Sequence, residues 1–270
     1  MHIQQRSAIR NVVEGSISPP SSVSIEQKPR QGWRRFMNER AIINRAYVPT
    51  SYEHAANCLT HGFLIVPSWI AAQRLLNRAK SPAQYWSSII YGNALIFLFS
   101  FSTIFHCSCF HPTYSDSTVR HLLHRVDRTF IYIFISASYT PWFLLRSTQT
   151  ISSSFTIALI WIMAIFGITY QTTYHERHKW LETCIYVIVG VFPGILTLDM
   201  NDHSGIFELA IGGLVFLVGI IFFKCDGIIP FAHAIWHCFV FLGAAIEYHA
   251  IYTYLLVPVY DYQFKTTKTV

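Results

Sequence analysis

The stretch Ile206–Phe223 reads IFELAIGGLVFLVGIIFF and carries almost no charge. Its length is close to the ~20 residues that a helix needs to cross the hydrocarbon core of a bilayer. An apolar run of this kind therefore predicts a membrane-spanning helix. Six further runs of similar character lie outward from it, at about Ala55–Leu76, Tyr85–Phe105, Thr129–Leu145, Ser154–Tyr170, Trp180–Leu198 and Ile228–Val257.

Short loops join these runs, so we expect an all-α fold, a seven-transmembrane helix bundle. The composition agrees with this expectation. Charged residues make up 13% of the 270-residue chain and hydrophobic residues 52%, whereas a soluble domain carries roughly 25% charged residues. The six cysteines include no CxxC pair and do not indicate a disulfide framework.

The net charge of +6 does not indicate a nucleic-acid partner, because the basic residues gather in the N-terminal segment and in short loops beside apolar runs. In these places anionic lipid and the positive-inside rule explain them. A cytosolic N-terminus puts most of the 20 Lys and Arg residues on the cytosolic side and leaves the C-terminus extracytosolic or luminal. We expect a disordered, basic cytosolic tail over residues 1–45, the seven-helix membrane domain over 46–258, and a short C-terminal tail over 259–270.

Two histidines, His233 and His237, stand at the start of the last apolar run. On a helix this spacing puts both imidazoles on one face, about 6 Å apart along the axis. His106, at the end of the second run, falls at the same membrane level under the predicted topology. Three neutral imidazoles leave one position open, which is the arrangement of a catalytic zinc site, so the three histidines are candidate ligands of Zn²⁺. The alternative for His233 and His237 is a hydrogen-bonded interhelical pair.

Two further polar residues fall at this level. Asp127, at the start of the third run, is a candidate catalytic group that holds a water molecule and acts as general base. Ser102 lies one turn before His106 on the same helix face, and we predict that it orients the water or an oxyanion. The alternatives are a structural ion pair for Asp127 and a serine bonded to its own helix for Ser102. Glu53, Asn57 and His61 form a polar stripe on the first helix that either supports the metal ligands or is a structural hydrogen-bond seam.

These residues, taken together, resemble the progestin and adipoQ receptor family, which is related to bacterial haemolysin III-like proteins. The resemblance covers about Trp33 to Tyr254 and is carried by motifs along most of the chain. They are Phe36-Met37-Asn38, Tyr52-Glu53-His54-Ala55-Ala56-Asn57-Cys58, His61 with Phe63-Leu64-Ile65-Val66-Pro67, Asp127-Arg128, Ala137-Ser138-Tyr139, Phe222-Phe223-Lys224, and Asp226-Gly227-Ile228-Ile229-Pro230 through His237.

The resemblance implies seven helices with the N-terminus inside and a zinc ion held by three histidines near the cytosolic face. The family's SxxxH motif corresponds to Ser102 and His106, its aspartate to Asp127, and its HxxxH motif to His233 and His237. Relatives with this site resemble ceramidase-type lipid amide hydrolases, and some act as hormone receptors. One branch is associated with Golgi, late endosomal and lysosomal membranes and with Ras-type signalling.

Three functional hypotheses follow. The first is an endomembrane signalling regulator or receptor with zinc-dependent hydrolysis of a lipid amide or ester, such as a ceramide-like lipid. The second is a non-catalytic scaffold in which zinc is structural and the N-terminal segment recruits signalling proteins at the cytosolic face. The third is a ligand-gated receptor. In each case the chain contacts membrane lipids and the expected location is the Golgi or the late endosome and lysosome membrane.

Overall fold

The computed structural model describes residues 32–41, 46–110, 118–174 and 177–256. From Trp33 onward these residues belong to one compact unit. No strand occurs within the described ranges, where Thr148 and Met200 form an isolated bridge. The elements are η1 (Gly32–Phe36), α1 (Ser51–Gly62), α2 (Ile65–Arg78), α3 (Pro82–Ser108), α4 (Thr118–Leu145), α5 (Ser153–Thr173), α6 (Lys179–Leu196), η2 (Thr197–Asp199), α7 (Ile206–Phe223), α8 (Ala232–Ala250) and the π-helical turn η3 (Ile251–Leu255).

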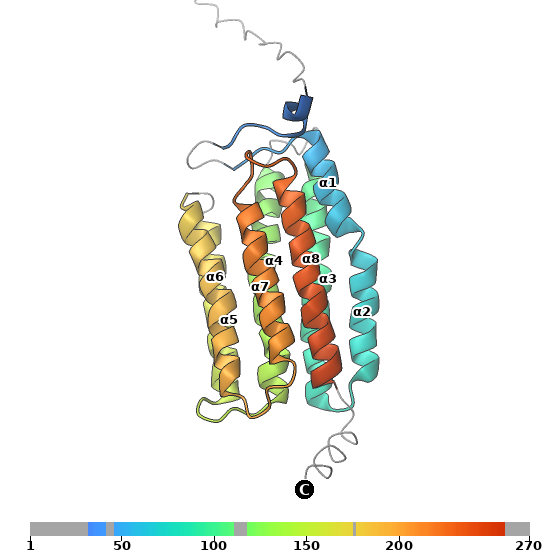
Figure 1. The fold of residues 1–270 in the computed structure, drawn as a ribbon, viewed down its shortest axis with the longest axis vertical. Coiled ribbons are helices and arrows are strands. Elements are labelled where there is room, and N and C mark those ends of the chain that lie inside the picture. The colour runs from blue at the N-terminus through green and yellow to red at the C-terminus, as the bar shows by residue number, and fades with distance from the viewer. Residues whose placement is uncertain (1–31, 42–45, 111–117, 175–176, 257–270) are drawn as a thin grey trace, which may run out of the picture. The chain divides into compact units, whose positions relative to one another are not determined.

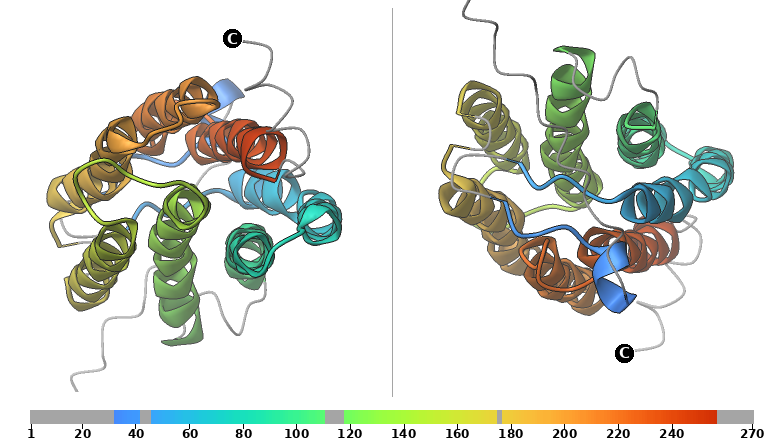
Figure 2. Two further views of the ribbon diagram at one scale, coloured as in Figure 1. Left: turned by 90° about the horizontal axis from the view of Figure 1, so that it is seen from below. Right: turned by 90° about the horizontal axis from the view of Figure 1, so that it is seen from above.

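The long helices run side by side, parallel or antiparallel to one another (Figure 1). Sequence neighbours also pack as neighbours: α7 lies along α8, α3 along α4, α2 along α3 and α4 along α5. Both end views show α2 beside α3 and α7 beside α8 (Figure 2). The expected all-α fold is therefore confirmed for the described residues.

Within the part of the chain that the structure describes, six helical segments are long and apolar enough to cross a membrane by length and composition. The fourth helix, α4, is not among them, although it contains the predicted apolar run 129–145. The middle of this run is polar. The side chains of Ser136, Ser138 and Thr140 are buried there, each at most 3% exposed. These side chains are enclosed by neighbouring helices, so α4 does not need an apolar surface of its own there.

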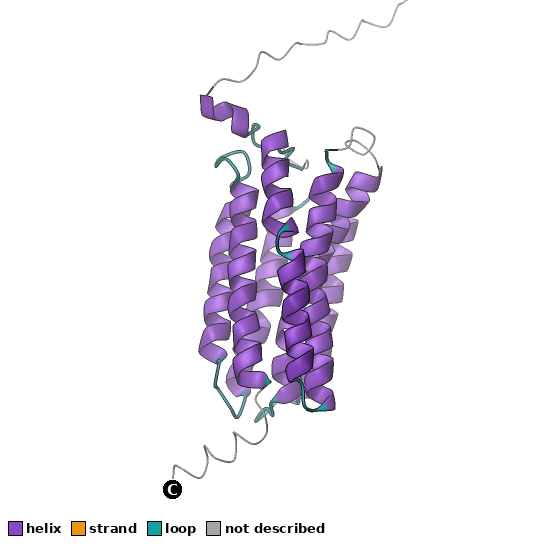
Figure 3. Cartoon of the chain, turned by 90° about the vertical axis from the view of Figure 1, so that its right-hand side faces the viewer, coloured by secondary structure: helices purple, strands orange, loops and turns teal. Residues whose placement is uncertain are grey.

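The first predicted run, Ala55–Leu76, forms two helices rather than one. The break lies at Phe63 and Leu64, between α1 and α2, and it is seen as a loop segment in the side view (Figure 3). Pro67 accounts for it, because proline has no N–H to donate and its ring clashes with the carbonyl four residues before it, which belongs to Phe63.

The last predicted run, from Ile228, begins as a turn, and α8 starts only at Ala232. Gly227 (φ 76°) and Phe231 (φ 57°) both adopt left-handed backbone conformations in this turn. At Gly227 an added Cβ would lie 2.5 Å from the Cα of Arg40, so a glycine is needed for this close approach. The turn places His233 and His237 in the first two turns of α8.

The packing of α2 on α3 gives a test of the fold. A Cβ added at Gly92 would lie 2.8 Å from the Cβ and 3.2 Å from the Cα of Ala72. We expect Gly92→Ala to lower the free energy of unfolding by about 1–3 kcal/mol, because the two helices must move apart. Thermal unfolding of the purified protein in detergent measures this loss.

The matched control is Gly213→Ala on α7, where nothing lies within 4 Å of an added Cβ. Alanine is the better helix former, so this variant should be as stable as the wild type or up to about 1 kcal/mol more stable. Equal midpoints for the two variants would show that the close contact between α2 and α3 does not matter.

Candidate metal centre

Three histidines come together at one end of the bundle. His106 lies in the last turn of α3, and His233 and His237 lie at the start of α8, all at the end where α1 begins (Figure 1). One ligand atom from each ring lies within 4.8 Å of the other two. The ring centroid of His106 lies 5.2 Å from that of His233 and 5.2 Å from that of His237. The three rings are therefore close enough to hold one metal ion.

A threonine of α1 fixes the tautomer of His237. Thr60 Oγ1 lies 3.0 Å from His237 Nδ1 and donates its proton to the carbonyl of Ala56, 2.9 Å away. The Asn57 carbonyl, 3.1 Å away, is a second acceptor for this proton. With its one proton given to a carbonyl of α1, Oγ1 accepts a hydrogen bond from Nδ1–H of the imidazole. The lone pair of His237 is then on Nε2, the atom that remains available to a metal.

An asparagine of α1 lies beside the Nδ1 atom of His106, as Thr60 lies beside that of His237. The side-chain amide of Asn57 lies 3.5 Å from His106 Nδ1. Asn57 Oδ1 and His106 Nε2 are both buried and have no hydrogen-bond partner among the described residues. Rotating the Asn57 amide by 180° exchanges its oxygen and nitrogen and puts Asn57 Oδ1 against His106 Nδ1–H. Oδ1 then accepts a hydrogen bond, and the lone pair of His106 is on Nε2. That nitrogen is then available to a cation.

His233, the most exposed of the three rings, faces a carboxylate. Asp226 Oδ2, in the turn before α8, lies 3.8 Å from His233 Nδ1. Each of the three histidines thus has an outer polar group beside its Nδ1, and carboxylate, carbonyl and hydroxyl groups in this position are typical of metal-binding histidines. The donor set fits a zinc ion with three imidazole ligands and one open position.

The polar stripe predicted on α1 divides into two parts. Asn57 and His61 face the histidine cluster, and the His61 ring stacks on that of His237 with centroids 3.6 Å apart. Glu53 instead accepts hydrogen bonds from Tyr47 Oη (3.0 Å) and the Thr50 backbone N–H (2.8 Å), and it completes a capping box at the start of α1. Burial raises the pKa of Tyr47, and the Glu53 carboxylate adds to the increase, so the phenol keeps its proton.

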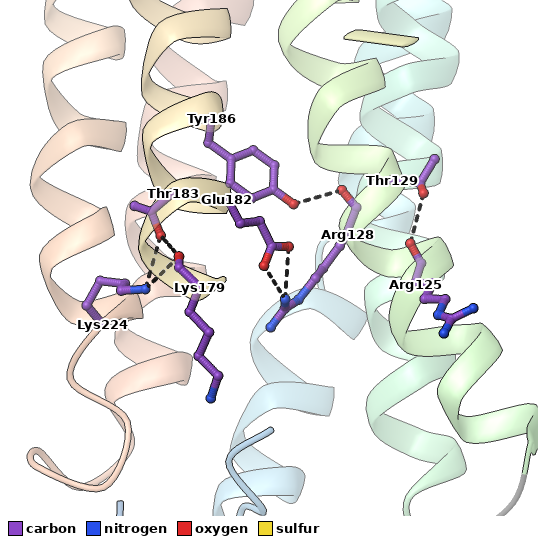
Figure 4. Close-up of polar contacts among 8 residues, drawn as sticks. All are labelled: Arg125, Arg128, Thr129, Lys179, Glu182, Thr183, Tyr186 and Lys224. Carbon is purple, nitrogen blue, oxygen red and sulfur yellow. Dashed lines mark hydrogen bonds and ion pairs between the residues drawn. The ribbon is translucent and has the colours of Figure 1, made fainter. Parts of the chain in front are cut away.

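The two predicted catalytic residues lie next to the cluster. The Ser102 hydroxyl faces the Asp127 carboxylate, and His233 is close enough to Asp127 to act on it electrostatically. Asp127 does not belong to the group of three ligands. Its neighbour Arg128 points toward α6, where its Nη1 lies 3.0 Å from both carboxylate oxygens of Glu182 (Figure 4).

Further contacts tie α4, α6 and α7 together at this level. Tyr186 Oη donates to the Arg128 carbonyl at 3.4 Å, and Lys224 Nζ donates to Thr183 Oγ1 at 3.1 Å (Figure 4). Breaking a buried ion pair such as Arg128–Glu182 is costly because it leaves a charge without its partner. This network therefore holds α4, and with it Asp127, against α6.

A cavity of about 490 Å³ extends from the cluster into the bundle. It lies between α3, α4, α6, α7 and α8, and its wall is mainly apolar. Ser102, Asp127, His233 and His237 line one end of it. This volume falls within the range of small-molecule sites in proteins.

Two residues at the centre, Thr60 and Asp226, were not predicted from the sequence. Thr60 precedes His61 and lies one helical turn after Asn57, so its place on the same face of α1 was a usable signal. Asp226 stands in the turn before α8, and its approach to His233 depends on how Gly227 and Phe231 fold that turn.

A family model described as haemolysin-III related matches residues 51–248, which include all five candidate site residues. The match covers most of the chain, and the protein belongs to the haemolysin-III related family. The resemblance inferred from the sequence motifs is thereby confirmed. Together with the apolar helices, the family indicates an integral, multi-pass membrane protein.

Individual relatives are similar over most of their length. The chain is 47% identical over 229 residues to a monocyte to macrophage differentiation factor from Rattus norvegicus, covering 84% of this chain and 94% of that one. The Homo sapiens protein of the same name is 47% identical over 226 residues, covering 83% and 93% of the two chains. Hemolysin-3 from Bacillus cereus is 31% identical over 210 residues, covering 76% and 92%.

The role of Thr60 can be tested by removing its hydroxyl. We expect Thr60→Val to lower metal affinity about 10–100-fold, because His237 loses the acceptor that fixes its tautomer. Metal content after competition with a chelator, measured by elemental mass spectrometry on the purified protein, gives the result. Thr60→Ser should restore affinity.

Thr103→Val is the matched control, since the Thr103 hydroxyl donates only to the carbonyl of Phe99 in its own helix. Its metal content should equal that of the wild type. If Thr60→Val also keeps its full metal content under the chelator, the proposed tautomer control is wrong.

Proposed function

We propose that this protein is a zinc-dependent membrane hydrolase that cleaves a lipid amide inside the bundle. The observation that carries the proposal is the convergence of His106, His233 and His237, whose ligand atoms lie within 4.8 Å of one another. Each has an outer polar group at Nδ1, and together they offer three ring nitrogens to one cation beside an apolar cavity.

We further propose that α4 is a seventh span and that the site faces the cytosol. The 28-residue length of α4 and its packing on α3, α5 and α6 support the first point. Basic residues support the second by the positive-inside rule. Among the described side chains, those at the site end are Arg35, Arg40, Arg120, Arg125, Arg128, Arg177, Lys179 and Lys224, and those at the other end are Arg74, Arg78, Lys80 and Arg146.

His106, His233 and His237 would hold a zinc ion, which would supply Lewis acidity to activate water and polarise a carbonyl. The chain's own residues supply the proton transfers. Asp127 accepts a proton from the attacking water as the oxygen bonds to the amide carbon, and then gives it to the leaving amine as the C–N bond breaks. Ser102 donates to the Asp127 carboxylate and holds it toward the cavity.

The cavity favours a lipid as the substrate, because its wall is mainly apolar. A ceramide-like amide has the required long chains and one hydrolysable bond. We place the activity in Golgi or late endosomal and lysosomal membranes, where the product would act in signalling through proteins at the cytosolic face. The name of the mammalian relatives, monocyte to macrophage differentiation factor, agrees with a signalling role.

Asp127→Asn separates metal binding from catalysis. We expect the variant to keep the metal content of the wild type and to lose turnover about 10²–10⁴-fold, since the amide cannot accept the proton. The measurement is release of fatty acid from ceramides by the purified protein, with metal content determined on the same sample.

His106→Ala is the companion variant and should lose both metal and turnover. Full activity of Asp127→Asn would contradict its role as the base. If neither lipid product nor dependence on His106 is found, while removal of the metal lowers the unfolding temperature, the cation is structural and the protein is a scaffold.

A further inference from the structure

A second pair of buried polar residues lines the cavity. Glu247 on α8 is 5% exposed and Ser138 on α4 is 2% exposed, and the Ser138 hydroxyl faces the Glu247 carboxylate. Both line the cavity that reaches the histidine cluster. Glu247 comes ten residues after His237 on the same helix, so it lies roughly 15 Å further along the axis at 1.5 Å per residue.

Neither residue has its hydrogen bonds satisfied. Glu247 Oε2 and Ser138 Oγ have no hydrogen-bond partner of ordinary geometry among the described residues. Two tyrosines near Glu247 donate elsewhere, Tyr91 to the Ala244 carbonyl and Tyr139 to the Gly190 carbonyl. No Lys or Arg in the described ranges forms an ion pair with Glu247.

The surrounding helices accommodate this carboxylate closely. A Cβ added at Gly212 of α7 would lie 3.1 Å from Glu247 Cγ, so a glycine is what allows α7 to pack against this side chain. An ionisable group at membrane depth is expensive and implies a partner. Since no basic side chain supplies that partner here, a group brought by a ligand in the cavity would supply it.

The cavity wall between the histidine cluster and Glu247 indicates the chemistry of the remainder of the ligand. Leu98, Ile135, Leu209 and Val240 are among the apolar residues that line it. A long alkyl chain matches this wall, and a primary amine matches the carboxylate, because it offers both N–H donors and positive charge. A hydroxyl offers the donor without the charge, and a fatty acid adds a second negative charge.

We propose that Glu247 and Ser138 form a second polar subsite, which binds the amine of a long-chain lipid at the end of the cavity opposite the histidine cluster. This inference rests on the proposed function only in that the cavity takes a lipid. Glu247 accepts two hydrogen bonds from the amine, and Ser138 accepts the third.

The experiment uses the full-length protein in detergent and a photoreactive alkyl amine that carries a diazirine on its chain. Mass spectrometry identifies the labelled peptides, which we expect to contain residues of α4 and α8 around Ser138 and Glu247. Unlabelled dodecylamine should compete for labelling at lower concentration than dodecanol or dodecanoic acid. Glu247→Gln should raise the dodecylamine concentration needed by about tenfold or more, since hydrogen bonds to charged groups are strong.

Ser138→Ala is a second variant, with a smaller effect in the same direction, and it keeps the test available if Glu247→Gln does not fold. Glu39→Gln removes an exposed carboxylate outside the cavity and should leave competition unchanged. Equal competition by dodecylamine in the wild type and Glu247→Gln would overturn the proposal, as would dodecanoic acid competing as well as the amine.

The same labelling in His237→Ala distinguishes this subsite from the proposed hydrolase. Labelling that depends on Glu247 and persists without the metal supports the subsite, whether or not the wild type hydrolyses lipids. Labelling lost in Glu39→Gln as strongly as in Glu247→Gln would mean that the amine binds by surface charge alone, and the subsite would be rejected.

Discussion

The arrangement of this protein depends on one constraint: a polar group buried among apolar helices must find a partner. Water is scarce there, and an unsatisfied donor or acceptor costs up to several kcal/mol. The imidazoles of His106 and His237 are each 2% exposed, and each has an α1 residue beside its Nδ1. The outward nitrogens thus have polar partners within the fold, and the inward ones are available to a metal ion.

The position of α1 follows from this constraint and from one proline. A continuous helix from Ser51 to Arg78 would keep a single axis along α3. The break before Pro67 lets α1 and α2 take separate directions (Figures 1 and 3). Gly62, at the end of α1, leaves only 3.3 Å between an added Cβ and Thr103 of α3. This closeness brings Asn57 and Thr60 against histidines that come from two other helices.

The sequence was sufficient for the all-α class and the approximate positions of the helices, because these follow from apolar runs and helical spacing. It did not predict the break between α1 and α2 or the turn before α8. The HxxxH spacing of His233 and His237 also predicts that they share a helix face, as they do. The outer groups were harder to predict. Asp226 approaches His233 through a turn with two left-handed residues, and no periodicity encodes that. Glu53 was expected either to support the metal ligands or to belong to a structural hydrogen-bond seam, and the structure places it in a capping box with Thr50.

Three buried carboxylates show how the fold treats negative charge. Glu182 is paired with Arg128 across α4 and α6, and Glu53 accepts from a phenol and a backbone N–H at a helix start. The fold supplies hydrogen-bond donors to Glu182 and to Glu53. Glu182 thereby joins α6 to α4, and Glu53 stabilises the start of α1. Glu247 is as deeply buried, but the cavity beside it supplies no donor beyond the Ser138 hydroxyl. Among these three carboxylates of the described residues, Glu247 is the one for which we propose a partner from outside the chain.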